Sequence, residues 1–137
     1  MASIHKEILI DAPPDAVWDA IHDVGAIHRR LAPGFVVDTR LDGDARIVTF
    51  GNGLVARELI VDVGEAARRL VWSVVGGRMT HHNASLQVFA EGEGSSRVVW
   101  IADLLPHDLG PTIAGMIEQG MGVMRQTLER AARQHAG

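Results

Sequence analysis

The chain has 137 residues, 47% of them hydrophobic, a formal net charge of −4 and no cysteine. This length suffices for one domain with its own core, and the lack of cysteine excludes disulfide bonds and thiol catalysis. The scattered arginines give no basic patch, so nucleic acid is not an expected partner. No run approaches the roughly 20 apolar residues that cross a bilayer, and residues 1–6 lack the apolar stretch of a signal peptide. We therefore expect a single domain over residues 1–137, soluble and cytoplasmic, with no integral membrane segment.

The N-terminal part of the chain predicts one strand followed by two short helices. Apolar and polar residues alternate over residues 3–11, which is typical of a half-buried strand. Pro13 and Pro14 end this strand and suit a helix start. The apolar residues that follow share one helical face: Val17, Trp18 and Ile21. A second short helical segment is expected over residues 24–31, and the Ala-Pro-Gly sequence at 32–34 ends it.

Between residues 35 and 105 the hydrophobic period changes to two, which indicates strands joined by hairpins. Asp42-Gly43-Asp44, Gly51-Asn52-Gly53 and Gly76-Gly77 are turn signals. The predicted strands are 35–41, 46–50, 54–63, 69–75, 80–90 and 97–105.

The strand at residues 80–90 has the clearest alternation. His82, Ala84 and Leu86 share one face of this strand, opposite a row of polar residues. A one-residue slip would bury the polar row instead, at a cost of roughly 1–3 kcal/mol for each unpartnered group. We therefore expect His82 to point inward together with Ala84 and Leu86.

The last segment, residues 108–135, predicts one long amphipathic helix. Its apolar residues recur at three- and four-residue steps: Ile113, Met116, Ile117, Gly120, Met121, Met124, Leu128 and Ala131. Gly115, Gly120 and Gly122 each cost about 1 kcal/mol relative to alanine in a helix interior. We expect compensation either from an element that packs close to the backbone or from a ligand in a space lined by glycines and flexible methionines.

This order of elements is an α+β plan with an antiparallel sheet. Together with particular residues, it resembles the Bet v 1-like or START-like superfamily, also called SRPBCC. The residues that carry the resemblance are Ile8, Ile10, Ala12-Pro13, Val17-Trp18, Ile21, Asp23, Arg57-Glu58-Leu59, Arg69-Leu70-Val71-Trp72 and Val99-Trp100. The resemblance implies a helix-grip fold, in which a curved antiparallel sheet wraps around a long C-terminal helix and two short helices follow the first strand. One departure is visible, because His28-Arg29-Arg30 stands where many members carry a tryptophan.

The hydrophobic periodicity and the family resemblance predict different orientations for Glu58. Periodicity alone places Leu59, Val61 and Val63 on the buried face and leaves Glu58 in water. Residues 58–86 are also similar to the plant abscisic-acid receptors, which have a glutamate at the same distance before a Gly-Gly break. That similarity implies pocket-facing positions for Glu58, Trp72, Val74, Ala84 and Leu86. The receptors' latch sequence is absent and Ala84 replaces their tyrosine, so hormone sensing is not implied.

Our first functional expectation is a binding protein for a small hydrophobic molecule that is lipid-like, aromatic or polyketide-like. Such a molecule would lie between the sheet and the terminal helix, as a mostly apolar pocket with a few polar groups allows. We expect a monomer or a weak homodimer. The expected ligand-binding residues are Phe35, Phe50, Glu58, Trp72, Val74, His82, Ala84, Leu86, Ile117, Met121 and Met124.

The alternative expectation is an enzyme of the polyketide cyclase or dehydratase type, as the resemblance implies. General acid-base catalysis would then rest on His82, Glu58 or Asp103, the last with His107 near the helix start, because a poised imidazole or a desolvated carboxylate can move a proton. An enzyme of this kind needs two titratable groups that converge across one cavity. His81 and His82 project to opposite faces of a strand and no metal-binding spacing occurs, so no metal site is expected. No nucleotide-binding or nucleophile motif occurs either, and no cofactor is expected.

Overall fold

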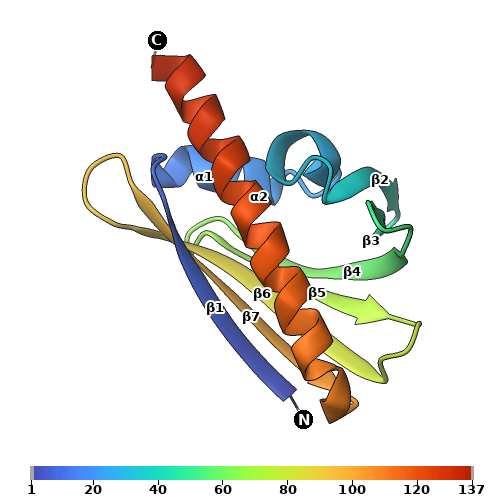
Figure 1. Cartoon of the computed structure of the whole chain (residues 1–137). Coiled ribbons are helices and arrows are strands. Elements are labelled where there is room, and N and C mark those ends of the chain that lie inside the picture. The colour runs from blue at the N-terminus through green and yellow to red at the C-terminus, as the bar shows by residue number, and fades with distance from the viewer. Residues whose placement is uncertain (1, 137) are drawn as a thin grey trace.

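The computed structural model describes residues 2–136 of the chain. Its elements are β1 (Ala2–Ile10), α1 (Pro14–His22), the short π-helical turn η1 (Ile27–Leu31), β2 (Val36–Asp42), β3 (Ala45–Phe50), β4 (Val55–Gly64), β5 (Arg69–Val75), β6 (His81–Ala90), β7 (Ser96–Leu105), the 3-10 turn η2 (His107–Leu109) and α2 (Gly110–Ala136). The strands form one antiparallel sheet in the order β1-β7-β6-β5-β4-β3-β2. The long helix α2 crosses the concave side of this sheet (Figure 1). The expected α+β helix-grip architecture is confirmed.

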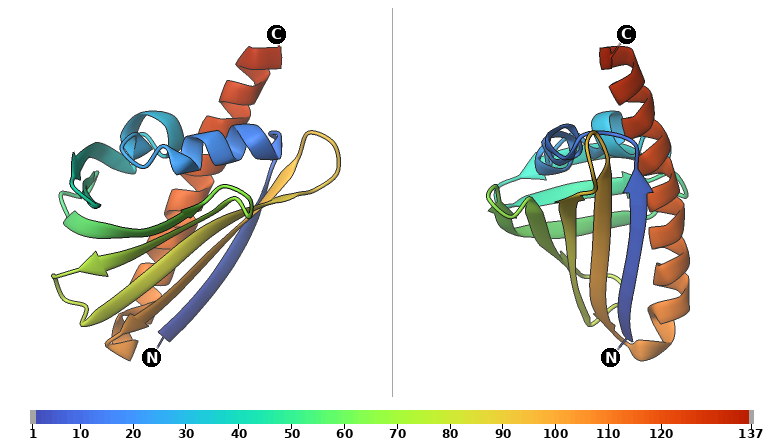
Figure 2. Two further views of the ribbon diagram at one scale, coloured as in Figure 1. Left: turned by 180° about the vertical axis from the view of Figure 1, so that it is seen from behind. Right: turned by 90° about the vertical axis from the view of Figure 1, so that its left-hand side faces the viewer.

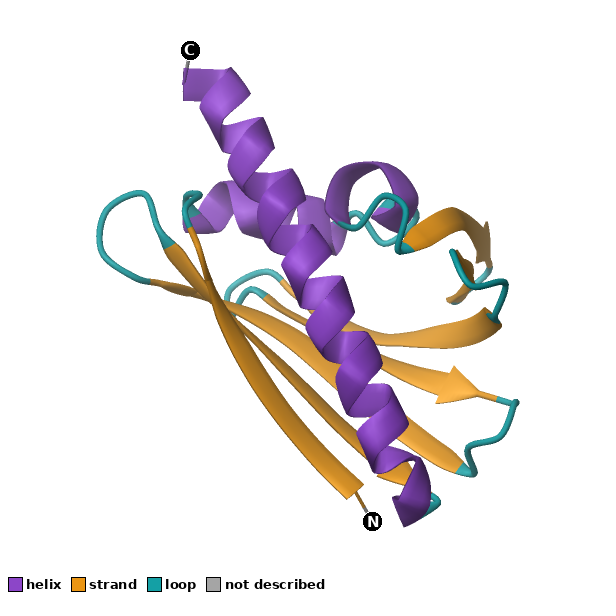
Figure 3. Ribbon diagram, viewed as in Figure 1, coloured by secondary structure: helices purple, strands orange, loops and turns teal. Residues whose placement is uncertain are grey.

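The helices lie on one side of the sheet only. In Figure 3 they occupy the concave side, and the convex face carries no helix in the described part of the chain. Figure 2 shows α1 and η1 together at one end of the sheet, next to the C-terminal half of α2. Inward-facing side chains are therefore enclosed by helices, whereas outward-facing ones meet solvent.

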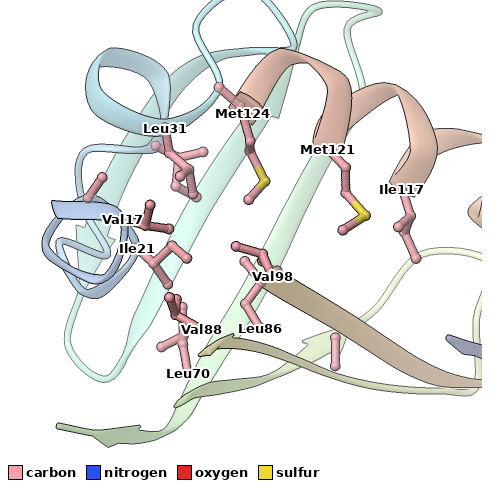
Figure 4. Packing of buried hydrophobic residues seen from close by; sticks show 14 of the residues in the cluster. Val17, Ile21, Leu31, Leu70, Leu86, Val88, Val98, Ile117, Met121 and Met124 are labelled. Carbon is pink, nitrogen blue, oxygen red and sulfur yellow. The ribbon is translucent and has the colours of Figure 1, made fainter. Parts of the chain in front are cut away.

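The core is filled with apolar side chains at the end of the fold beneath α1. Val17 and Ile21 of α1 are buried there against Leu70, Val88 and Val98 of the sheet (Figure 4). The expected apolar face of the first helix is thus confirmed. Burial of aliphatic side chains such as these contributes about 1.5–3 kcal/mol each, so this end anchors the fold.

The helical segments are shorter than the sequence predicts. Of residues 24–31 only η1 is helical, because a turn in which the Ala26 N–H donates to the Asp23 carbonyl oxygen precedes it. The long helix begins at Gly110, after η2, and not at Asp108. Ala131 was expected on the apolar stripe of this helix but is exposed.

Two β-bulges break the alternation that the sequence predicts. The register of β2 shifts between Val36 and Asp38, so Val36 and Thr39 are buried while Val37 is 53% exposed. A bulge moves side chains to the other face of a strand without changing the sequence pattern. The second shift lies in β4, between Ile60 and Asp62.

On β4 the expectation from periodicity is wrong. Leu59, Val61 and Val63 are 37%, 61% and 36% exposed, and Glu58 is only 7% exposed. The orientation of Glu58 implied by the family resemblance is the one observed.

Candidate ligand-binding cavity

A cavity of about 330 Å³ lies between the concave face of the sheet and α2. Strands β2 to β7, the η1 region and the N-terminal half of α2 supply its walls. Most of the lining is apolar or aromatic, and the predicted residues that line it are Phe35, Phe50, Glu58, Trp72, Val74, His82, Leu86, Ile117 and Met124. The cavity is at the small end of the range that holds small organic ligands.

Two residues of the predicted binding set lie outside the lining. Ala84 is 4% exposed and belongs to the packed core, where its short side chain is covered by neighbours. Met121 is also buried in the core. It lies at the edge of the apolar stripe of α2, beside Ile117 and Met124, which do line the cavity.

The cavity opens between two turns of the sheet and the start of α2. Leu54 and Val55, which precede and begin β4, line the cavity yet are 55% and 63% exposed. Across from them, Gly76, Gly77 and Arg78 of the β5–β6 turn also combine lining positions with exposure. Both glycines have positive φ, 82° and 74°, which side chains with a Cβ rarely adopt. A molecule would enter at this end.

The main polar feature of the cavity is an ion pair between Arg46 and Glu58. The Arg46 Nε–H donates to Glu58 Oε1 over 2.7 Å, and the side chains are 4% and 9% exposed. Arg46 also donates from Nη1 to the Val24 carbonyl oxygen at 3.3 Å, and its guanidinium lies 5.3 Å from the ring centre of Trp72. The sequence reasoning did not identify Arg46, although it is the charged partner of the carboxylate.

His82 lines the cavity as expected, but it does not pair with Glu58. Within the described chain no hydrogen bond joins the two residues, and His82 Nδ1 is enclosed without a partner. Desolvation by burial, with a smaller contribution from the neighbouring His81, lowers the pKa of His82 below its usual value. The imidazole is therefore neutral at pH 7. The charged partner of Glu58 is Arg46 and not His82.

Asp103 is not part of the cavity. Its neighbours on β7, Ala102 and Leu104, are fully buried, so the alternation of the strand turns Asp103 to the convex side. There its carboxylate accepts a hydrogen bond from Ser3 Oγ at 2.6 Å. Its expected role as a catalytic group in the cavity is therefore ruled out by position, and His107 is exposed in η2.

Two indole rings form much of the cavity wall. Trp72 and Trp100 meet edge to face with 5.8 Å between ring centres. The Trp100 Nε1–H is enclosed and has no acceptor among the described residues. No group of three or more His, Asp or Glu side chains suited to a metal ion occurs within residues 2–136.

A curved antiparallel sheet closed by a long C-terminal helix over an apolar cavity defines a helix-grip fold, the fold that START-like and Bet v 1-like proteins share. The chain belongs to the family described as polyketide cyclase / dehydrase and lipid transport, whose model matches residues 1–136. No curated protein has a sequence that matches this chain significantly. None of its described helices combines the length and apolar character that crossing a membrane requires.

Solved structures share this fold at low sequence identity. A protein from Thermobifida fusca is 26% identical with a TM-score of 0.78, and the match covers 98% of this chain and 95% of that one. A START superfamily protein from Mycobacterium smegmatis is 13% identical with a TM-score of 0.74, covering 96% and 97%. A point mutant of norcoclaurine synthase from Thalictrum, solved with a transition-state analogue, is 19% identical with a TM-score of 0.73, covering 99% and 96%. The last two likenesses concern the fold.

Proposed function

We propose that the protein binds a small, largely apolar molecule in the cavity between its sheet and α2 and acts as a carrier or receptor for it. The observation that carries the proposal is the cavity itself, about 330 Å³ with walls of aliphatic, aromatic and methionine side chains. Sites for small molecules have this composition, with few polar groups that fix orientation. Trp72, Phe35 and Phe50 supply flat contact area, which suits an aromatic or polyketide-like ligand.

The arrangement of polar groups favours binding over acid-base catalysis. Catalysis by the expected residues needs two titratable groups within reach of one proton. Glu58 is instead held in an ion pair with Arg46. His82 is left as a single titratable group without a bonded carboxylate.

The cyclase or dehydratase alternative retains one supporting observation. A neutral imidazole that lines an apolar cavity is a competent general base. Under that alternative, turnover of a β-keto substrate would be lost in His82→Gln while binding persists. Under the carrier proposal, His82→Gln changes affinity only and no product forms with either protein.

Native mass spectrometry of the purified protein, followed by thermal denaturation with a panel of aromatic and lipid-like compounds, tests the proposal. A ligand at one hundred times its Kd stabilises the folded state by about 2.7 kcal/mol, which raises Tm by several degrees. A co-purified mass or such a shift supports binding. No bound mass and no shift with any compound would overturn the proposal.

A pair of glycine variants in α2 locates the bound molecule. A Cβ added at Gly120 would lie 2.9 Å from Phe35 Cε2, so the Phe35 ring would have to move, and this ring forms part of the cavity wall. A Cβ at Gly115 meets nothing within 4 Å. Gly120→Ala should therefore weaken binding, whereas Gly115→Ala, the same change in the same helix, should leave it unaltered. Equal affinities for both variants would place the ligand elsewhere.

A further inference from the structure

The ion pair in the cavity is only partly engaged. An arginine and a carboxylate often form two parallel hydrogen bonds, but Arg46 and Glu58 form one, between Nε and Oε1. Arg46 Nη1 makes a second contact, with the Val24 carbonyl oxygen. Arg46 Nη2 and Glu58 Oε2 make no hydrogen bond within residues 2–136. The pair thus offers a free donor and a free acceptor.

Both free atoms face the cavity. Water outside the protein barely reaches the two side chains, which are 4% and 9% exposed, and both residues line the cavity. The fully enclosed polar side-chain atoms that lack a partner in the described chain are His28 Nδ1, Thr39 Oγ1, His82 Nδ1 and Trp100 Nε1. Arg46 Nη2 and Glu58 Oε2 are not among these, so they retain contact with open space, and that space is the cavity.

The surroundings hold this donor and acceptor in place. The guanidinium is fixed by Glu58, by the Val24 carbonyl oxygen and by the face of Trp72 at 5.3 Å. Arg46 and Glu58 also stand directly opposite each other on β3 and β4. A ligand therefore meets a preorganised pair, and preorganisation reduces the entropic cost of binding.

Charge decides which chemical group completes the pair. Arg46 and Glu58 together are neutral, so an ionised carboxylate would place a second negative charge beside Glu58, and an ammonium group would face Arg46. Such repulsion is strong where water is excluded. An uncharged group with an acceptor next to a donor meets neither penalty and can bond to both free atoms.

We infer that the cavity selects ligands whose buried end is an uncharged donor-acceptor group, such as a carboxamide, a hydroxy-ketone or a protonated carboxylic acid, bound between Arg46 Nη2 and Glu58 Oε2. This inference rests on the proposed binding function and adds the chemical class of the ligand. The apolar remainder of the ligand would lie against Trp72 and extend toward the mouth.

Three probes with one apolar skeleton test the inference by titration calorimetry at pH 7: 4-phenylbutanamide, 4-phenylbutanoate and butylbenzene. Charge-assisted hydrogen bonds contribute enough to separate such compounds by about tenfold or more. The amide should therefore bind the wild-type protein at least about tenfold more tightly than the carboxylate, and more tightly than butylbenzene.

Glu58→Gln should reverse this preference, because it leaves the positive charge of Arg46 without a counterion. The carboxylate should then bind more tightly than the amide, and it should raise the Tm of this variant more than the amide does. The double variant Arg46→Met with Glu58→Leu makes the site apolar. It should keep butylbenzene binding and lose the preference for the amide.

Asp42→Asn is the matched control for Glu58→Gln. Asp42 pairs with Arg57 at the same 2.7 Å but on exposed side chains, so the order of the three affinities should remain that of the wild type. Equal affinities of amide and butylbenzene, or a preference for the carboxylate in the wild type, would overturn the inference while binding itself stands. Failure of all three probes to bind the wild-type protein would overturn the inference and count against the proposed function as well.

Discussion

Arg46→Met should destabilise the folded protein by about 3–5 kcal/mol, because it leaves the Glu58 carboxylate buried without its counterion. The side chains of the pair are 4% and 9% exposed, so water can replace the lost partner only in small part. A chain of this size has a total stability of the order of 5–15 kcal/mol. The variant should therefore remain folded at 25 °C but unfold at a clearly lower urea concentration.

A double-mutant cycle separates the cost of leaving the Glu58 carboxylate unpaired from the loss of the attraction between Arg46 and Glu58. Replacing a complete buried pair by apolar residues is often neutral or stabilising, so Arg46→Met with Glu58→Leu should recover most of the loss. Equilibrium urea unfolding at pH 7, followed by circular dichroism, measures all four corners of the cycle. The corresponding cycle on Arg57 and Asp42, also 2.7 Å apart but 44% and 61% exposed, should show no measurable coupling. If the double variant is no more stable than Arg46→Met alone, the unpaired carboxylate is not the cause and the reasoning fails.

Three smaller changes test other parts of the structure by urea unfolding. Thr39→Val should stabilise the protein by about 1 kcal/mol, because Thr39 Oγ1 is enclosed without a partner; a loss of stability would reveal a hydrogen bond that the geometry does not show. Gly115→Ala should add about 1 kcal/mol through helix propensity, and Gly120→Ala should fall short of that gain because its Cβ meets the Phe35 ring. Since burial lowers the pKa of folded His82, the unfolded chain binds more protons as the pH falls below about 6.5. Stability contributed by the neutral imidazole is then lost from that pH downward, and His82→Leu should remove this part of the acid sensitivity; unchanged pH profiles would contradict it.

The inward direction of His82 could be predicted because β6 has no irregularity. Its polar and apolar residues alternate from Asn83 to Val88, and the register with β7 runs unbroken from His81 to Ala90. The same logic could not exclude Asp103 from the cavity, because Ile101 and Leu105 on its own face of β7 are as apolar as Ala102 and Leu104 on the other. Alternation therefore predicts side-chain direction well where the two faces of a regular strand differ in polarity.

The partner of Glu58 was also within reach of the sequence. The predicted turn Gly51-Asn52-Gly53 joins β3 and β4, and pairing outward from Asn52 places Arg46 opposite Glu58, as the observed register does. Family resemblance indicated an inward carboxylate, but only the pairing supplies its charge partner. In an apolar environment a buried carboxylate requires such a partner.

The bulges in β2 and β4 could not be predicted in the same way. The exposure of Val37 depends on a register shift between Val36 and Asp38, and that of Val61 on one between Ile60 and Asp62. Neither site contains a glycine or proline to mark it. Leu59, next to the inward-facing Glu58, points to the convex face that no helix covers, so hydrophobicity alone misidentifies the buried side of this part of β4.

Buried polar groups that cost stability are distributed unevenly between the packed core beneath α1 and the walls of the cavity. Beneath α1 the core consists of apolar side chains such as Ile21, Leu70 and Val98. The enclosed ion pair, the unpartnered His82 and Trp100 nitrogens and Gly120 all line the cavity instead. His28 Nδ1 and Thr39 Oγ1 are unpartnered away from it, so an unpartnered atom alone does not mark the site. The site is marked instead by several destabilising groups that surround one cavity. Proteins keep such groups together where a function requires them.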